Sequence, residues 1–99
     1  MRHEIRLHEF KLDAREMAHP EPFEKSTAIL LTLNQGEYLR MLHWRIPYPL
    51  FDFCHAQKLD FVVNELNKDD YEIIIFFASD IKALTEQGVF AMRGKRLSL

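Results

Sequence analysis

The sequence predicts an α/β (α+β) two-layer sandwich: a mixed four-stranded sheet with two helices on one face, and a C-terminal extension. Three observations predict this class. Apolar and polar residues alternate over strand-length segments, prolines stand at the starts of two amphipathic segments, and two further apolar segments flank a short polar turn. Taken in chain order, these elements give βαβαββ.

The first strand is expected at residues 9–12, where Phe10 and Leu12 alternate with charged residues. A Pro-Glu-Pro segment follows at 20–22. Proline suits the first turn of a helix, and an acidic side chain there complements the helix dipole. A helix is therefore expected over residues 22–33.

The second strand is expected at residues 38–43. Its alternation places two sets of side chains on opposite faces: Leu39, Met41 and His43 on one, and Tyr38, Arg40 and Leu42 on the other. The prolines within 44–49 exclude a sheet interior, so this stretch is expected to be a loop with a helix start. A short second helix then runs from Leu50 to about Gln57.

Residues 59–66 and 71–78 predict an antiparallel hairpin that turns at 67–70. The segment 73–78 is apolar at successive positions, so both of its faces require burial, and two helices on one side cover only one of them. We expect the other face to be covered by the extension together with a homodimer contact through the open sheet face. In that extension Ser79 caps a helix that carries Ile81 and Leu84.

Length and composition point to one domain. The 99 residues are 47% hydrophobic and 28% charged, as in an ordinary globular protein, and we expect a single domain over 1–99 with a core at about 9–78 and an extension and tail at 79–99. A net charge of −2 gives no general attraction for nucleic acid or anionic membranes. The first residues lack the apolar segment of a secretory signal, and no apolar run approaches a membrane span, so a cytoplasmic location is expected.

Two proline segments carry a family resemblance. Residues 12–22, Leu-Asp-Ala-Arg-Glu-Met-Ala-His-Pro-Glu-Pro, resemble the signature of the TusA-like (SirA-like) family, in which a Leu-Asp strand end leads to Cys-Pro-x-Pro at a helix start. The later Pro-Tyr-Pro-Leu-Phe at 47–51, preceded by His43, resembles a segment of domain of unknown function family 2249. The resemblance implies the same βαβαββ fold.

In the sulfur carriers, the cysteine before Pro-x-Pro accepts a persulfide; here that position is His19. Histidine cannot form a persulfide, so direct sulfur relay at this position is excluded. Cys54, the only cysteine, lies among apolar residues of the second helix, where a small buried hydrophobe is expected. The contexts associated with family 2249, hemerythrin-like proteins and nitrogen-oxide respiration, suggest partner binding or redox-linked regulation.

Candidate site residues gather around two loops. His19 could bind a metal or an anion-bearing ligand or act as a general base, or it could simply cap or pack. A second set, which could line a pocket beside His19 or form a rim packed on the first helix, consists of His43, Trp44, Arg45 and Tyr48.

Arg15 in the first loop and Glu21 at the helix start complete the candidate ligand-binding set, although surface charges at a turn usually contact nothing specific. No histidine pair has metal-ligand spacing on one helical face, so no cofactor is predicted, and a metal or haem on His19 and His43 stays an alternative. The cations of tail residues 93–96 fit a disordered tail better than a binding site.

The sequence offers no Gly-rich phosphate loop, no paired carboxylates and no metal motif, which disfavours an enzyme. The first hypothesis is therefore a binding or regulatory module that engages a protein partner or small ligand near His19. The second is a metal- or haem-dependent redox protein using His19 and His43, and the third is sulfur transfer through Cys54.

Overall fold

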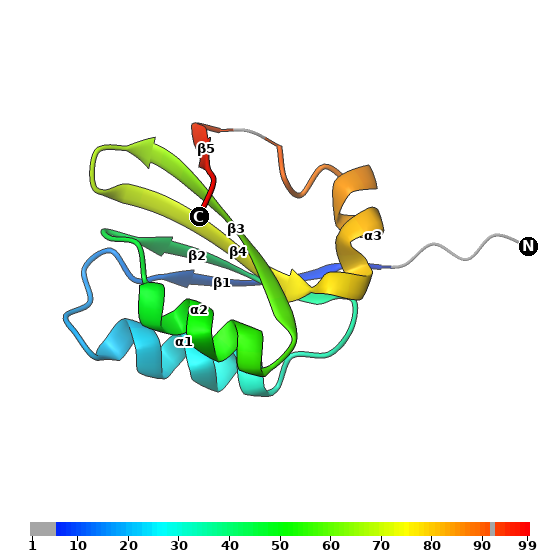
Figure 1. Cartoon of the computed structure of the whole chain (residues 1–99), viewed down its shortest axis with the longest axis horizontal. Helices are drawn as coiled ribbons and strands as arrows, with labels where there is room; N and C mark the ends of the chain where they lie inside the picture. Colours follow the sequence, from blue (N-terminus) through cyan, green and yellow to red (C-terminus); the bar gives the residue numbers. More distant parts are fainter. Residues whose placement is uncertain (1–5, 92) are drawn as a thin grey trace, which may run out of the picture.

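The computed structural model describes residues 6–91 and 93–99, and these form a mixed sheet with helices against it (Figure 1). The predicted α+β class and its βαβαββ order are confirmed. The elements are β1 (His8–Asp13), α1 (Glu21–Leu31), β2 (Glu37–His43), α2 (Tyr48–Ala56), β3 (Leu59–Asn67), β4 (Asp70–Phe77), a 3₁₀ turn (Ala78–Asp80), α3 (Ile81–Glu86) and β5 (Lys95–Leu97).

The strands lie in the order β1-β2-β4-β3-β5. β1 and β2 pair in parallel, and every other pair is antiparallel. Because β1 and β2 are parallel neighbours, their carboxyl ends meet at the same edge of the sheet, and α1 and α2 both begin just beyond that edge. Crevices outside the carboxyl ends of parallel strands are common binding sites in α/β sheets.

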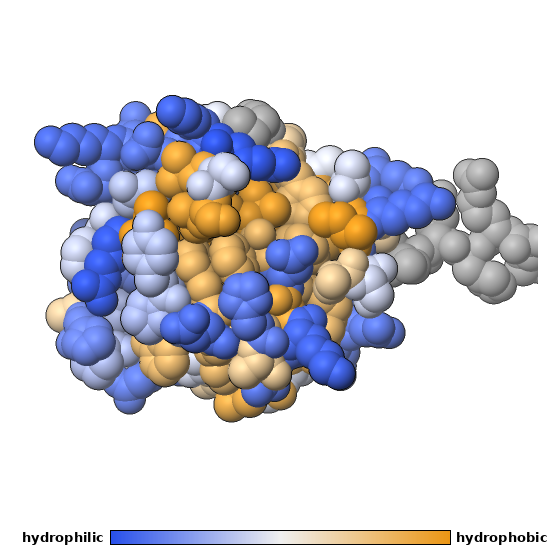
Figure 2. Space-filling model, in the orientation of Figure 1, coloured by the Kyte–Doolittle hydropathy of each residue, from blue (hydrophilic) through white to orange (hydrophobic). Residues whose placement is uncertain are grey.

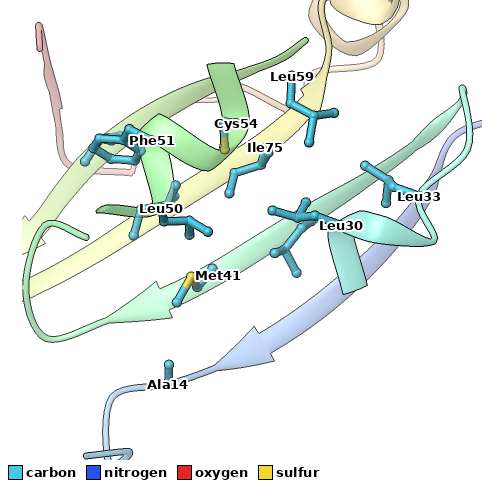
Figure 3. Close-up of a cluster of buried hydrophobic side chains, with 12 residues drawn as sticks. Ala14, Leu30, Leu33, Met41, Leu50, Phe51, Cys54, Leu59 and Ile75 are labelled. Atoms are coloured by element: carbon cyan, nitrogen blue, oxygen red, sulfur yellow. The ribbon is translucent and has the colours of Figure 1, made fainter. Parts of the chain in front are cut away.

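Helices α1 and α2 lie on one face of the sheet (Figure 1). Their apolar side chains form the larger core cluster: Figure 3 shows Leu30 of α1 and Leu50 of α2 directed toward the strands that carry Met41 and Ile75. Cys54 is fully buried in this cluster, which confirms that it is a small core hydrophobe. In the described part of the chain, no helix has the length and apolar character that a membrane span needs.

The opposite face carries a second core cluster. Tyr38, Ile74 and Phe76 of the sheet pack there with Leu84 of α3, and Val89 and Phe90 add partly buried contacts. Ile74 and its neighbour Ile75 both have no exposed surface, so the strand is buried on both faces. The prediction that the extension covers the second face is confirmed, whereas the homodimer contact stays a prediction.

The four-strand prediction is wrong in one respect, because the tail forms a fifth strand. Residues 95–97 pair with Val63, Asn64 and Glu65 of β3. Gly94 allows this approach: its φ is +156°, and a Cβ at that position would collide with the backbone carbonyl of Glu65. The expectation of a disordered tail at 93–96 is therefore corrected.

Several helix boundaries also differ from the prediction. Helix α1 ends at Leu31, two residues before the predicted end at residue 33. The residue that precedes α3 as its N-cap is Asp80, and no side chain caps this helix; Ser79 instead accepts a hydrogen bond from Gln35 at 3.1 Å. Helix α2 begins at Tyr48, two residues before the predicted Leu50, because Pro49 fits its first turn.

Candidate functional site

A pocket of about 260 Å³ opens where the first turns of α1 and α2 converge. Most of its wall is apolar and comes from both helices, from β2 and from the loop before α2: Pro22, Phe23, Met41, Pro47, Pro49 and Leu50. The polar part of the lining consists of His19, Ser26, His43, Trp44 and Arg45. No carboxylate side chain is among these lining residues.

Proline shapes both helix starts. Pro20 and Pro47 are the N-cap residues of α1 and α2, and each helix has a further proline two residues later. The fixed φ of proline is already helical, and its missing N–H is one that a first turn leaves unpaired anyway. Since the two helices follow the neighbouring strands β1 and β2, these rigid starts form facing walls of one pocket.

His43, the last residue of β2, is only 2% exposed. Its Nδ1 accepts hydrogen bonds from the backbone N–H groups of Trp44, at 2.9 Å, and of Arg45, at 3.4 Å. A nitrogen that accepts these bonds carries a lone pair, so the proton of the neutral ring sits on Nε2. Burial, and then the charge of Arg45, lower the pKa of His43, which keeps the ring neutral at neutral pH.

The Nε2–H group of His43 is left as a donor. Within residues 6–91 and 93–99, no hydrogen bond from Nε2 of His43 to an acceptor is formed, while the ring lines the pocket. Nε2 is not one of the buried unpaired polar atoms of the described chain, so it keeps some exposed surface, and because the ring lines the pocket this donor is open to an acceptor supplied by a ligand.

Trp44 and Arg45 form the rim. The indole Nε1 of Trp44 donates to the backbone carbonyl of Met17 at 3.2 Å, which ties the loop before α2 to the loop before α1. The Arg45 guanidinium lies 4.9 Å from the centre of the Trp44 ring, a cation–π contact. Among the described residues, no carboxylate lies within 4.0 Å of Arg45. The rim is thus cationic and aromatic.

Four of the seven predicted ligand-binding residues line this one pocket: His19, His43, Trp44 and Arg45. Tyr48 lies outside it, 59% exposed, with its ring edge-on to Phe51 at 6.0 Å. Glu21 is exposed in the first turn of α1, where it complements the helix dipole.

Arg15 lies elsewhere and closes a turn. Its guanidinium makes two hydrogen bonds to Asp13, at 2.9 and 2.7 Å, and it approaches Asp70 at 4.0 Å. The hydrogen bonds from Arg15 lower the pKa of Asp13 to about 2. These contacts engage Arg15 within the chain, so it does not contribute to the pocket.

Sequence reasoning missed several lining residues, among them Phe23, Ser26, Met41 and Leu50. Ser26 is fully buried and donates to the backbone carbonyl of Pro22 at 2.6 Å, so its small side chain leaves room in the pocket. The sequence signal that could have located these lining residues is the repetition of Pro-x-Pro after two successive strands. If the strands are parallel neighbours, that repetition places both helix starts at one edge.

Neither a metal cluster nor a reactive thiol occurs near this pocket in the described structure. Across residues 6–91 and 93–99, no group of three or more His, Cys, Asp or Glu side chains could hold a metal ion. Burial, and then the charge of Asp60, raise the pKa of the Cys54 thiol to about 12. A thiol with such a pKa is almost entirely protonated at neutral pH and is a poor nucleophile.

Comparison with known proteins gives one match. The family model described as "Uncharacterized conserved protein (DUF2249)" matches residues 11–78, which span β1 to the end of β4 and include every residue that lines the pocket. Searches of curated proteins and of solved structures found no match.

Proposed function

The chain belongs to the DUF2249 family of uncharacterized conserved proteins, and from its geometry we propose that it is a binding or regulatory module and not an enzyme. In this proposal the pocket beside His19 and His43 engages a small ligand or a group of a protein partner. The likeness to the TusA-like sulfur carriers is part of this proposal. The module keeps the position of their site but not their chemistry, because His19 stands in place of the cysteine.

The pocket itself is the observation that carries the proposal. A concave, largely apolar space with a few convergent polar groups is the usual form of a ligand site. Its volume of about 260 Å³ is slightly below the range of about 300–1,000 Å³ for drug-sized ligands. A small metabolite or a single inserted side chain would match this size.

The polar groups of the pocket favour binding over catalysis. A catalytic site needs a nucleophile or an acid/base pair within reach of the reacting atoms. The lining contains no carboxylate, no cysteine and no lysine, and the hydroxyl of Ser26 is committed to the carbonyl of Pro22. His43 holds its Nδ1 lone pair against two backbone N–H groups, so it offers a hydrogen bond rather than a base.

A metal- or haem-dependent redox role is the second candidate, favoured by the fact that His19 and His43 line the same pocket. For Nε2 of His43 to ligate a metal, the proton would have to move to Nδ1, where it would oppose the N–H groups of Trp44 and Arg45. The pocket volume also suits a ligand smaller than a haem. Sulfur transfer through Cys54 ranks third, because that thiol is fully buried.

A fragment screen by nuclear magnetic resonance tests the proposal. Trp44 is the only tryptophan, so its indole N–H gives a single resonance that reports from the pocket rim. Small fragments should shift this resonance together with amides of β2 and α1 in the wild type. They should not do so in Ser26→Leu, which fills the pocket from its wall.

Trp44→Phe serves as a second variant, because a change at the exposed rim preserves the fold if Ser26→Leu does not. It lacks the indole resonance and is followed through the amides of β2 and α1, and it should weaken every fragment that stacks on the indole. The absence of any pocket-directed fragment in the wild type would overturn the binding proposal. Metal analysis and absorbance spectra of freshly purified protein test the redox candidate. Stoichiometric metal or haem that disappears in His19→Ala/His43→Ala would favour it instead.

A further inference from the structure

We propose that the group held in this pocket is a carboxylate attached to a small apolar body, such as a short aliphatic or aromatic acid or the chain end of a peptide. This inference rests on the proposed binding function and adds the chemical class of the ligand. Four observations lead to it: the charge of the rim, the free donor on His43, the direction of the two helix starts and the apolar interior.

The first observation is uncompensated positive charge. Arg45 stacks on Trp44 at the rim, and within the described chain no carboxylate lies within 4.0 Å of it. Arg15 and Arg40 behave differently, because each is held by a carboxylate of the chain at 2.7 Å. Arg45 is therefore available to an anion from outside, and a guanidinium matches the geometry of a carboxylate.

The second observation is the state of His43. Two backbone N–H groups hold the Nδ1 atom, which leaves Nε2–H as a donor in a side chain that is 2% exposed and lines the pocket. This donor is unpaired within the described chain and open to the pocket, so it can bind a ligand that brings an acceptor. A carboxylate oxygen is a stronger acceptor than a neutral amide or alcohol oxygen, because hydrogen bonds to ionised groups are stronger.

The third observation is that α1 and α2, of 11 and 9 residues, both begin at the pocket. The N-terminal end of a helix carries partial positive charge, so both helices favour an anion between them. Glu21 and Glu24 oppose this effect at the start of α1, whereas the first turn of α2 has no acidic residue. The field is therefore most favourable on the α2 side, where Arg45 also lies.

The fourth observation, the apolar interior, indicates the chemistry of the rest of the ligand. Met41 and Leu50 are almost fully buried, and Phe23 and the prolines complete an apolar wall. A multiply charged anion such as a phosphate ester would lose hydration in this space without enough donors to replace it. A single carboxylate at the rim, with an apolar body inside, satisfies both parts of the pocket.

Matched acid and amide pairs test the inference. Hexanoate and hexanamide, and benzoate and benzamide, are titrated into the full chain while the Trp44 indole resonance is followed. The acids should bind at least about tenfold more tightly than their amides, which corresponds to about 1.4 kcal/mol. A short peptide ending in leucine, as free acid and as C-terminal amide, distinguishes a chain end from a free small molecule as the source of the carboxylate.

Two variants test whether the charge of Arg45 causes the preference for acids over amides. Arg45→Gln removes the exposed charge and should weaken the acids about tenfold while leaving the amides unchanged. Lys25→Gln is the matched control, because this exposed cation of α1 does not line the pocket and its loss should change neither class.

The outcomes separate this inference from the proposed function. Equal binding of acids and amides, or weakening of both by Arg45→Gln, would overturn the carboxylate assignment while leaving the pocket as a binding site. If none of the acids binds, the inference fails, and the fragment screen with neutral compounds decides whether the binding function fails with it.

Discussion

At the residue scale, His43 combines a buried position with a proton-free Nδ1 that accepts two backbone hydrogen bonds. Protonation of Nδ1 would turn both contacts into repulsions between N–H groups. The folded protein therefore binds this proton less readily than the unfolded chain, and the pKa of His43 is lowered from its ordinary value of 6.5 by burial and by Arg45.

This difference predicts a loss of stability in weak acid. Below about pH 6.5 the unfolded chain gains a proton at His43 that the folded state does not, so the free energy of unfolding should fall as the pH drops from about 7.5 to 5.5. The slope from one group cannot exceed about 1.4 kcal/mol per pH unit. Urea denaturation at a series of pH values measures it.

His43→Asn is the informative control, because the amide oxygen of asparagine can accept the N–H groups of Trp44 and Arg45 but does not titrate. The variant should show a flatter dependence of stability on pH across this window. An identical slope in wild type and variant would mean that His43 does not cause the acid sensitivity.

The candidate site was partly predictable at this scale. His19, His43, Trp44 and Arg45 stand beside the two Pro-x-Pro segments, and the structure brings all four to one pocket. The predicted face of β2, with Met41 and His43 on the same side, is confirmed as well, since Met41 belongs to the core under the helices. The protonation state of His43 could not be predicted, because it depends on how the backbone turns after β2.

At the element scale, Glu72 of β4 joins several parts of the fold. Its carboxylate has no exposed surface and accepts hydrogen bonds from Arg40 of β2 at 2.9 Å, from Asn64 of β3 at 3.2 Å and from Arg93 in the segment before β5. Burial alone would raise the pKa of Glu72, but these hydrogen bonds outweigh it, and the pKa lies below the usual value. The carboxylate is therefore charged at neutral pH.

Removing the Glu72 side chain should lower the free energy of unfolding substantially. Glu72→Ala would remove the fully buried carboxylate that Arg40, Asn64 and Arg93 share and leave Arg40 with only the partly exposed Glu9. Breaking a buried ion pair from one side typically costs about 3–5 kcal/mol. Glu9→Ala is a matched control, since Glu9 binds the same arginine at 2.7 Å but is 33% exposed, and a pair of that kind contributes about 0–1 kcal/mol. Equal losses for the two variants in chemical denaturation would contradict the assigned role of burial.

The elements differ in how far the sequence could predict them. Strands β1 to β4 and helices α1 and α2 follow from apolar periodicity, and their predicted positions agree with the structure to within two residues at every boundary. Strand β5 could not be predicted, because its three residues carry no apolar alternation and pair only where Gly94 lets the chain approach β3. The hydrogen bond of Ser79 to Gln35 likewise depends on a contact between distant segments.

At the scale of the whole molecule, the two faces of the sheet are covered by different parts of the chain. Helices α1 and α2 and the strands beneath them fall within the family match at residues 11–78, whereas the cover of the opposite face comes from residues beyond it. Figure 2 shows apolar surface in the middle of one side of the molecule, and Figure 1 shows β5 at the top and α3 at the right of the same view. A chain of this size therefore depends on a short extension to complete its second core cluster.

The last prediction concerns that extension. A chain ending at residue 78 would lose Leu84, Val89 and Phe90 and would expose Ile74 and Phe76, each of which contributes about 1.5–3 kcal/mol when fully buried. Exposure of an apolar sheet face favours association, so this variant should form dimers or larger species in size-exclusion chromatography with light scattering. A chain ending at residue 91 keeps the cover while losing β5, and it should keep the subunit count of the full-length chain. If both truncated chains have the same subunit count, the extension does not close this face. A contact between copies would then be the alternative cover, and the subunit count of the full-length chain measures it.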